Sequence, residues 1–426
     1  MKPLHYYKKL FVAIMLHDQD YDTRPSSLSE SALSPLKKIL RFAQIIIAVP
    51  LSLLSWIILR VLSTRYQVSI YVLKPFRPGW GSTYLNMMEP LCRQLQHENN
   101  SRHIKILVEP GEAVSKILVE SYEPHFTLYL DDRKKFLRLI AYLVPKSGLE
   151  KKFITKSDKS INNWLQPPSK NFINLNNQLP PDLANFGIER QNFVLFTHAS
   201  KKYYEKRSSS GTVSSMHYRF NDLSTFELAI EQIFKNNLKV VRVGVDVDEL
   251  PATLKSLPII DYTSELRNET SELWLYENCK FLLSATSGAY WFARRFDRPS
   301  ILMNSYAFPL GFFSTYYTMM LLKNTKSDEL WSFSKTISYR SDSDYLEQSF
   351  LTRHGIEFVP NSPQTILNAV QEMLNPDDPS LLTFPEGDVK LIHRYKEILT
   401  EFQVPFVDKM SLPSISFLRE FQHLLK

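Results

Sequence analysis

The stretch Lys239–Asn304 constrains the fold most, because short apolar runs recur along it at the spacing of βαβ units. The runs lie at 240–243, 258–260, 281–283 and 301–303, and longer polar or helix-like segments separate them. Apolar runs that do not alternate with polar residues indicate strands buried on both faces, as in a parallel sheet covered by helices. The stretch therefore predicts an α/β fold.

Small and hydroxylated residues follow the third of these runs. Thr286, Ser287 and Gly288 lie between the run and a helix-like segment at 289–295. A strand, a tight turn and a helix N-terminus present backbone N–H groups that suit a phosphate or a diphosphate. The same residues could instead form an ordinary capped turn, because neither a full dinucleotide fingerprint nor a P-loop is present.

Length and charge set limits on the class of protein. The 426 residues are enough for two or three domains, and the net charge of +7 suits an anionic ligand or an anionic membrane surface. The positive charge is too dispersed to indicate nucleic acid. The two cysteines, Cys92 and Cys279, form no CxxC pair, which argues against a disulfide framework and against a cysteine zinc site.

An uncharged apolar segment at 42–59, within an N-terminal region at 1–66, predicts association with a membrane. Its length is at the lower limit for crossing a bilayer, and Pro50 lies at its centre. The spacing of Ala48 and Ser52 also gives a helix one less apolar face, which weakens the spanning interpretation and suits a helix that lies in the interface or re-enters the same leaflet. A buried core helix is the alternative, and spanning or interfacial insertion both stay open. Cations flank the segment: Lys37, Lys38, Arg41, Arg60 and Arg65.

The pattern of strand, turn and helix begins near residue 67 and begins again near residue 190. In the first half, apolar runs at 68–73 and 104–108 follow one another, with Gly79 and Gly81 in the turn between strand and helix. Such a turn opens a Rossmann-type domain, although it could also be a simple connection. We expect an α/β protein with two Rossmann-like domains, 67–185 and 190–385, facing across a cleft and followed by a helical tail at 386–426.

The second half carries a set of six motifs in fixed order. Together they resemble a family of bacterial glycosyltransferases found with surface-polysaccharide biosynthesis, and the match extends over about residues 190–375. The N-terminal half matches only loosely. The segments are HYRFNDLSTFELAI, KVVRVG, PIIDYTSELR, CKFLLSATSG, FDRPSILMN and GIEFVPNSPQTILNAVQEML.

The resemblance implies the GT-B fold and transfer of a sugar from a nucleotide-sugar donor to a glycan or lipid-linked acceptor. Residues 190–385 would hold the donor and 67–185 the acceptor, at the cytoplasmic face of the inner membrane, without a metal or other cofactor. Substrate-binding candidates come from the motifs and from the two glycine turns. They are Gly79, Gly81, Arg219, Asn221, Arg242, Gly244, Asp261, Thr286, Ser287, Gly288 and Asn304.

The general base that deprotonates the acceptor has three candidates: His217, His198 and Glu89. The family tends to show an H-x-R-D segment after the strand that opens the second domain. Here the corresponding run is 197–200, Thr-His-Ala-Ser, and the Arg and Asp are missing. A non-catalytic relative that binds a nucleotide sugar or a glycan is therefore the alternative. The D-x-D at Asp246 and Asp248 resembles a metal-binding motif of another glycosyltransferase fold, but it arises often by chance.

Overall fold

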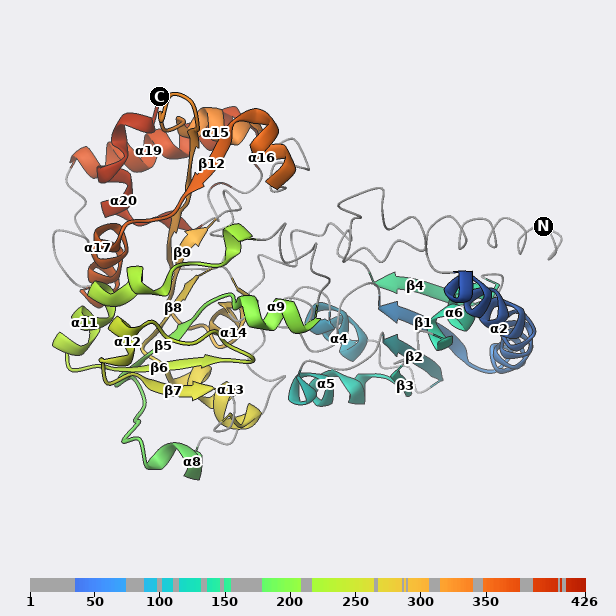
Figure 1. Cartoon of the computed structure of the whole chain (residues 1–426). Helices are drawn as coiled ribbons and strands as arrows, with labels where there is room; N and C mark the ends of the chain where they lie inside the picture. The colour runs from blue at the N-terminus through green and yellow to red at the C-terminus, as the bar shows by residue number, and fades with distance from the viewer. Residues whose placement is uncertain are drawn as a thin grey trace. The chain divides into compact units, whose positions relative to one another are not determined.

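The chain divides into two compact units, Met1–Asn174 and Leu175–Lys426 (Figure 1). This division lies earlier than the end expected for the first domain at residue 185. The structure is a computed structural model, and it describes residues 35–73, 88–97, 102–109, 115–131, 136–145, 149–154, 178–207, 217–263, 267–285, 287–288, 290–305, 315–339, 348–375, 386–404, 407 and 411–426.

The first unit contains a four-stranded parallel sheet in the order β3-β2-β1-β4. The expected strands at 68–73 and 104–108 are confirmed as β1 (Gln67–Leu73) and β2 (His103–Glu109). The others are β3 (Leu128–Asp131) and β4 (Glu150–Ile154). We did not predict β4, because its sequence EKKFI belongs to a basic run. Charged residues are typical of edge strands, where they discourage pairing with other chains.

Among the described residues of this unit, four α-helices accompany the sheet: α2 (Pro35–Leu62), α4 (Glu89–His97), α5 (Lys116–Tyr122) and α6 (Phe136–Leu143). α2 and α6 lie side by side (Figure 1). Ile45 and Ala48 of α2 pack on Leu139 and Leu143 of α6 in one buried cluster. Within the described residues, α2 supplies one stretch long and apolar enough to cross a membrane, Ala43–Leu62.

The second unit is built on a seven-stranded sheet in the order β13-β10-β9-β8-β5-β6-β7, and all its neighbouring strands run parallel. These are β5 (Phe193–Thr197), β6 (Lys239–Gly244), β7 (Ile260–Thr263), β8 (Phe281–Ala285), β9 (Ser300–Ser305), β10 (Tyr316–Met319) and β13 (Leu412–Pro413). A separate antiparallel pair joins β11 (Leu321–Asn324) and β12 (Ile356–Val359). The expected parallel α/β class is therefore present in both units, whereas a cleft between two domains stays a prediction.

One strand boundary differs from its prediction. The apolar run at 258–260 predicts a strand that ends before Asp261, but β7 begins at Ile260 and includes Asp261. Asp261 pairs in register with Arg242 of β6. The carboxylate therefore lies within the sheet, beside a buried guanidinium, rather than in the turn after the strand.

Helices cover both faces of the seven-stranded sheet. On one face, apolar side chains of α13 (Glu269–Asn278), α14 (Tyr290–Arg295), α15 (Phe333–Tyr339), α19 (Glu386–Glu401) and α20 (Ile415–Glu420) share a core with the strands. On the other face, α11 (Glu227–Lys235), α12 (Ala252–Lys255) and α17 (Pro363–Leu374) do the same. The described residues of this unit also form the α-helices α8 (Pro181–Ala184), α9 (Lys201–Arg207) and α16 (Gln348–His354).

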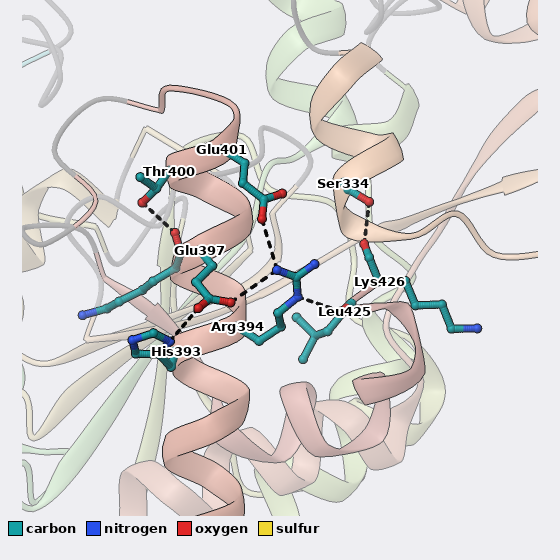
Figure 2. Close-up of polar contacts among 9 residues, drawn as sticks. Ser334, His393, Arg394, Glu397, Thr400, Glu401, Leu425 and Lys426 are labelled. Carbon is teal, nitrogen blue, oxygen red and sulfur yellow. Dashed lines mark hydrogen bonds and ion pairs between the residues drawn. The ribbon is translucent and has the colours of Figure 1, made fainter.

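The C-terminal segment is an integral part of the second unit. β13 extends the sheet by pairing with β10, and Phe417 and Leu418 of α20 are buried in the core. Polar contacts hold the last residues in place (Figure 2). Arg394 Nε of α19 donates to the carbonyl of Leu425 at 3.3 Å, and Ser334 Oγ of α15 donates to the carbonyl of Lys426 at 2.6 Å.

Gly244 ends β6 in a backbone conformation that only glycine adopts easily, with φ +147°. A Cβ atom there would lie 2.7 Å from Cγ1 of Val247. We expect Gly244→Ala to destabilise the second unit by about 1–3 kcal/mol, because it adds backbone strain and a clash. Urea unfolding followed by circular dichroism measures this loss.

Gly387→Ala is the matched control, since nothing lies within 4 Å of a Cβ at that helical glycine of α19. It should leave stability unchanged or raise it slightly, because alanine favours the helix by about 1 kcal/mol over glycine. Equal stability of the two variants would contradict the strain assigned to Gly244.

Candidate functional site

The strand order of the second unit defines a switch point, the place in its sheet where successive connections run in opposite directions. Counted from β5, the order is 3-2-1-4-5-6-7, so β6 lies on one side of β5 and β8 on the other. In such sheets, ligands bind outside the carboxyl ends of the strands, where the connections diverge. The segments that leave this point are His198–Ser200 after β5 and the turn with Ser287 and Gly288 after β8.

In the turn after β8, the glycine is exposed to solvent and the serine is buried. Ser287 is buried, and its hydroxyl lies 3.5 Å from that of Ser284. Gly288 is exposed, and a Cβ built on it meets nothing within 4 Å. A ligand can therefore approach the backbone at Gly288, whereas the Ser287 side chain faces the protein. Thr286 lies outside the described residues.

Arg242 forms a buried polar cluster at the same edge of the sheet. Its side chain is 1% exposed. Its Nη1 donates to Oδ2 of Asp261 at 3.2 Å, and its Nη2 donates to Nε2 of His198 at 3.0 Å and to the carbonyl of Asp248. Burial lowers the pKa of Arg242, while Asp261 opposes this shift. An arginine stays charged in proteins, so the cluster holds a permanent positive charge.

The cluster fixes the protonation state of His198. Because a guanidinium can only donate, Nε2 of His198 accepts, and Nδ1 carries the proton that it donates to the carbonyl of Ala199 at 3.2 Å. Burial and the nearby Arg242 charge lower the pKa of His198 to about 4. Both ring nitrogens are engaged and the ring is neutral at pH 7. This geometry suits a positioning role better than that of a general base.

The turn after β6 joins this cluster to α9. Asp248 accepts the backbone N–H groups of Lys201 and Lys202 at 2.8 and 3.0 Å, and Asp246 pairs with Lys206. The two carboxylates of the D-x-D thus hold α9 against the end of β6. Among the residues that the structure describes, no group of three or more His, Cys, Asp or Glu could hold a metal ion.

A second polar network lies at the ends of β9 and β10. Asn304, at φ +52°, donates through Nδ2 to Oδ1 of Asn221 at 2.6 Å and accepts the N–H of Asn361 at 2.6 Å. Asn361 Nδ2 donates in turn to the carbonyl of Met319 at 2.9 Å, and Thr318 Oγ1 donates to Asn361 Oδ1. We did not predict Asn361 as a site residue, although the motif VPNSP contains it.

This network positions the segment that carries Arg219. Asn221 Nδ2 donates to the carbonyl of Arg219 at 3.1 Å, and the Arg219 guanidinium lies 5.2 Å from the ring centroid of Tyr204 on α9. Arg219 is half-buried, in contrast to the fully buried Arg242. Of the two predicted cations, Arg219 is therefore the one that a ligand can reach. Its short helix also contains His217, whose side chain lies outside the described part.

The remaining predicted residues belong to the first unit. Glu89 begins α4, is buried, and forms an ion pair with Arg93. Gly79 and Gly81 lie outside the described residues. The structure thus groups His198, Arg242, Gly244 and Asp261 in one cluster and Arg219, Asn221 and Asn304 in another, with Ser287 and Gly288 at the same sheet edge. The site roles themselves stay predictions.

No family model matches the chain, and no curated protein matches its sequence. Similar solved structures include a glycosyl transferase family 9 protein from Veillonella parvula, with 12% identity over 73% of this chain and 98% of that one, at a TM-score of 0.43. The Escherichia coli ADP-heptose LPS heptosyltransferase II has 15% identity over 73% of this chain and 99% of that one, at a TM-score of 0.41.

A third similar structure is TibC, a dodecameric iron-containing glycosyltransferase of enterotoxigenic Escherichia coli. Its identity is 12% over 57% of this chain, which spans 59% of TibC, at a TM-score of 0.35. All three proteins are glycosyltransferases, the class that the six sequence motifs resemble. Each TM-score lies below 0.5, so these similarities assign no function to this chain.

The lowered pKa of His198 predicts that stability falls as the pH falls from 6.5 to 4. In this window the unfolded chain protonates the imidazole, while the folded protein keeps it neutral down to about pH 4. The unfolded state therefore binds more protons, which costs up to about 3 kcal/mol of stability. In His198→Asn this contribution is absent, so stability should depend less on pH. Urea unfolding at several pH values measures both slopes, and identical slopes would contradict the assignment.

Proposed function

We propose that the chain is a glycosyltransferase that moves a sugar from a nucleotide-sugar donor to a glycan or lipid-linked acceptor. The proposed setting is surface-polysaccharide biosynthesis at the cytoplasmic face of a bacterial inner membrane. The six motifs of the second half support this assignment through the family that they resemble. The geometry of the second unit gives independent support.

The observation that carries the proposal is the open glycine at the switch point of the seven-stranded sheet. β5 and β8 are neighbours, and the chain leaves them in opposite directions. Gly288 follows β8, is exposed, and has free space around it. Doubly wound sheets bind nucleotides and their phosphates at this position, where glycine allows a close approach of the backbone.

Transfer from a nucleotide sugar requires that negative charge on the departing diphosphate be stabilised. The bond between the sugar and the diphosphate oxygen breaks, and the acceptor oxygen forms a new bond to the sugar. We assign the cationic contribution to Arg219, because it is partly exposed and its segment is fixed through Asn221 and Asn304. We assign Arg242 a supporting role rather than ligand contact, because its guanidinium is buried and bonded to Asp261 and His198.

The proposal assigns charge stabilisation to protein groups rather than to a metal. Asp246 already pairs with Lys206, and Asp248 accepts two backbone N–H groups of α9. Both carboxylates would have to leave these partners to bind a cation together. We assign the acceptor to the first unit, in which Gly79, Gly81 and Glu89 stay candidates, and an anionic membrane surface as a further partner.

A non-catalytic protein that binds a nucleotide sugar or a glycan is the second candidate. The geometry of His198 favours it, because neither ring nitrogen offers a lone pair to an acceptor hydroxyl. The Arg and Asp that the family tends to carry after this histidine are also missing. The two candidates share the donor site and differ only in turnover.

The donor site predicts that filling the space at Gly288 blocks binding. In a thermal-shift screen of UDP-, GDP-, ADP- and CMP-linked sugars, we expect one class to raise the melting temperature of the full chain. Gly288→Leu should weaken that donor at least about tenfold, which corresponds to 1.4 kcal/mol. A donor that binds this variant as well as it binds the wild type would contradict the site.

Gly387→Leu is the matched control, because Gly387 also has nothing within 4 Å but lies on α19. It should bind the donor as the wild type does. Release of free nucleotide, with and without acceptor, then separates the two candidate functions. Transfer or slow hydrolysis supports the enzyme, whereas binding without any turnover across donors and acceptors supports the scaffold.

A further inference from the structure

α2 has an apolar outer face that the protein does not cover. Within the described part of the chain, more than half of the exposed large apolar side chains belong to this helix. They recur at helical spacing and form one continuous stripe, defined here as the outer face. Its members are Ile46, Ile47, Leu51, Leu53, Leu54, Ile57, Ile58 and Val61.

The opposite face of α2, the inner face, is fixed to the rest of the first unit along most of the helix. Near its start, Ile45 and Ala48 pack on α6, and Ser52 is buried as well. Toward its end, Trp56 and Leu59 pack on the cluster that includes β1. A helix that crossed the bilayer would expose this inner face to lipid and would lose these contacts. The packing therefore favours a helix that stays on its unit.

Charge identifies the partner of the outer face as anionic lipid. The sequence of α2 contains Lys37, Lys38, Arg41 and Arg60, and no acidic residue. Arg60 and the following Arg65 are exposed. Cations at both ends of an apolar stripe match the anionic headgroups around a hydrocarbon layer. The outer face of a second copy of this chain would bring like charges together.

We propose that α2 lies parallel to the membrane plane and inserts its outer face into one leaflet of an anionic bilayer. This inference rests on the membrane partner assigned above and deepens it, because it fixes the orientation of the helix and the class of lipid. It is independent of the donor chemistry. The first unit then docks on the membrane as a monotopic body, held by apolar contact and by the flanking cations.

Flotation of the full chain with vesicles tests the partner. Binding is expected to vesicles with about 30% phosphatidylglycerol in phosphatidylcholine, to be much weaker with phosphatidylcholine alone, and to fall as salt rises. The double change Leu54→Glu and Ile58→Glu should lower the bound fraction at least tenfold. Val389→Glu, at an exposed apolar residue of α19, is the matched control and should bind as the wild type does.

Depth measurements separate the parallel orientation from a spanning one. Ile47→Cys, Leu54→Cys and Val61→Cys place a fluorophore at three points of the outer face, and both native cysteines are buried. At 1.5 Å per residue, the first and last points lie about 21 Å apart along the helix. Quenching by nitroxide lipids should report equal, shallow depths for all three. In a spanning helix Leu54 would lie near the bilayer centre, about 10 Å deeper than the other two points, and this result would overturn the proposal.

Two other outcomes also overturn it. In the first, the full chain binds neither vesicle type but forms a dimer, and Leu54→Glu dissociates this dimer. That result would assign the outer face to a second copy of the chain. A monomer that floats with neither vesicle would remove the membrane partner together with this inference. Donor binding and turnover in solution would stand in both cases, so failure here is distinguishable from failure of the proposed transferase activity.

Discussion

The buried charge of Arg242 is the constraint on which the edge of the second sheet depends. A guanidinium taken out of water must find acceptors for its donors, because an unpaired buried charge is very costly. Its acceptors come from three neighbouring strands: His198 after β5, Asp248 after β6 and Asp261 within β7. One side chain thereby fixes the relative positions of three strand ends, which is the requirement for a preorganised site.

This constraint divides the polar residues into those that support and those that can contact a ligand. Arg242 and His198 bond to each other and are buried, so they hold the scaffold. The turn that begins at Gly244 places Asp248 in contact with two elements. The Asp248 carbonyl accepts from Arg242, and its carboxylate accepts from the start of α9. α9 in turn presents Tyr204 to the half-buried Arg219. The half-buried Arg219 is therefore connected through α9 to the buried cluster around Arg242.

The sequence predicts the parts of the fold that depend on apolar burial. The cores of strands β5, β8 and β9 are apolar runs, as is β6 apart from Arg242, because both of their faces are covered by helices. The edge strands β4 and β13 escaped prediction, since one is charged and the other is only two residues long and contains Pro413. Local pattern carries no information about an edge strand whose stability comes from a neighbour distant in the chain.

The sequence predicts which strand ends carry the candidate site residues, but not which of these residues become partners. Asp261 and Arg242 lie 19 residues apart, and only the register of β6 and β7 makes them partners. Asn361 meets Asn304 from 57 residues away, so no spacing rule connects them. Ser287 was expected to face a ligand, yet it is buried, because the direction of one side chain in a tight turn depends on what packs beneath it. Backbone topology follows from pattern, whereas side-chain partnership follows from tertiary contacts.

The role of α2 also depends on tertiary contacts that the sequence pattern does not give. From composition alone it is an apolar segment that fits a core helix and a membrane span equally well. The structure separates it into two faces by size: small Ala48 and Ser52 allow close packing on α6, while large side chains such as Leu54 and Ile58 point outward. A helix in water would be arranged the other way round. Transfer of a half-exposed large apolar side chain into hydrocarbon is worth about 1 kcal/mol, so a stripe of them gains several kcal/mol only if the solvent beyond it is lipid.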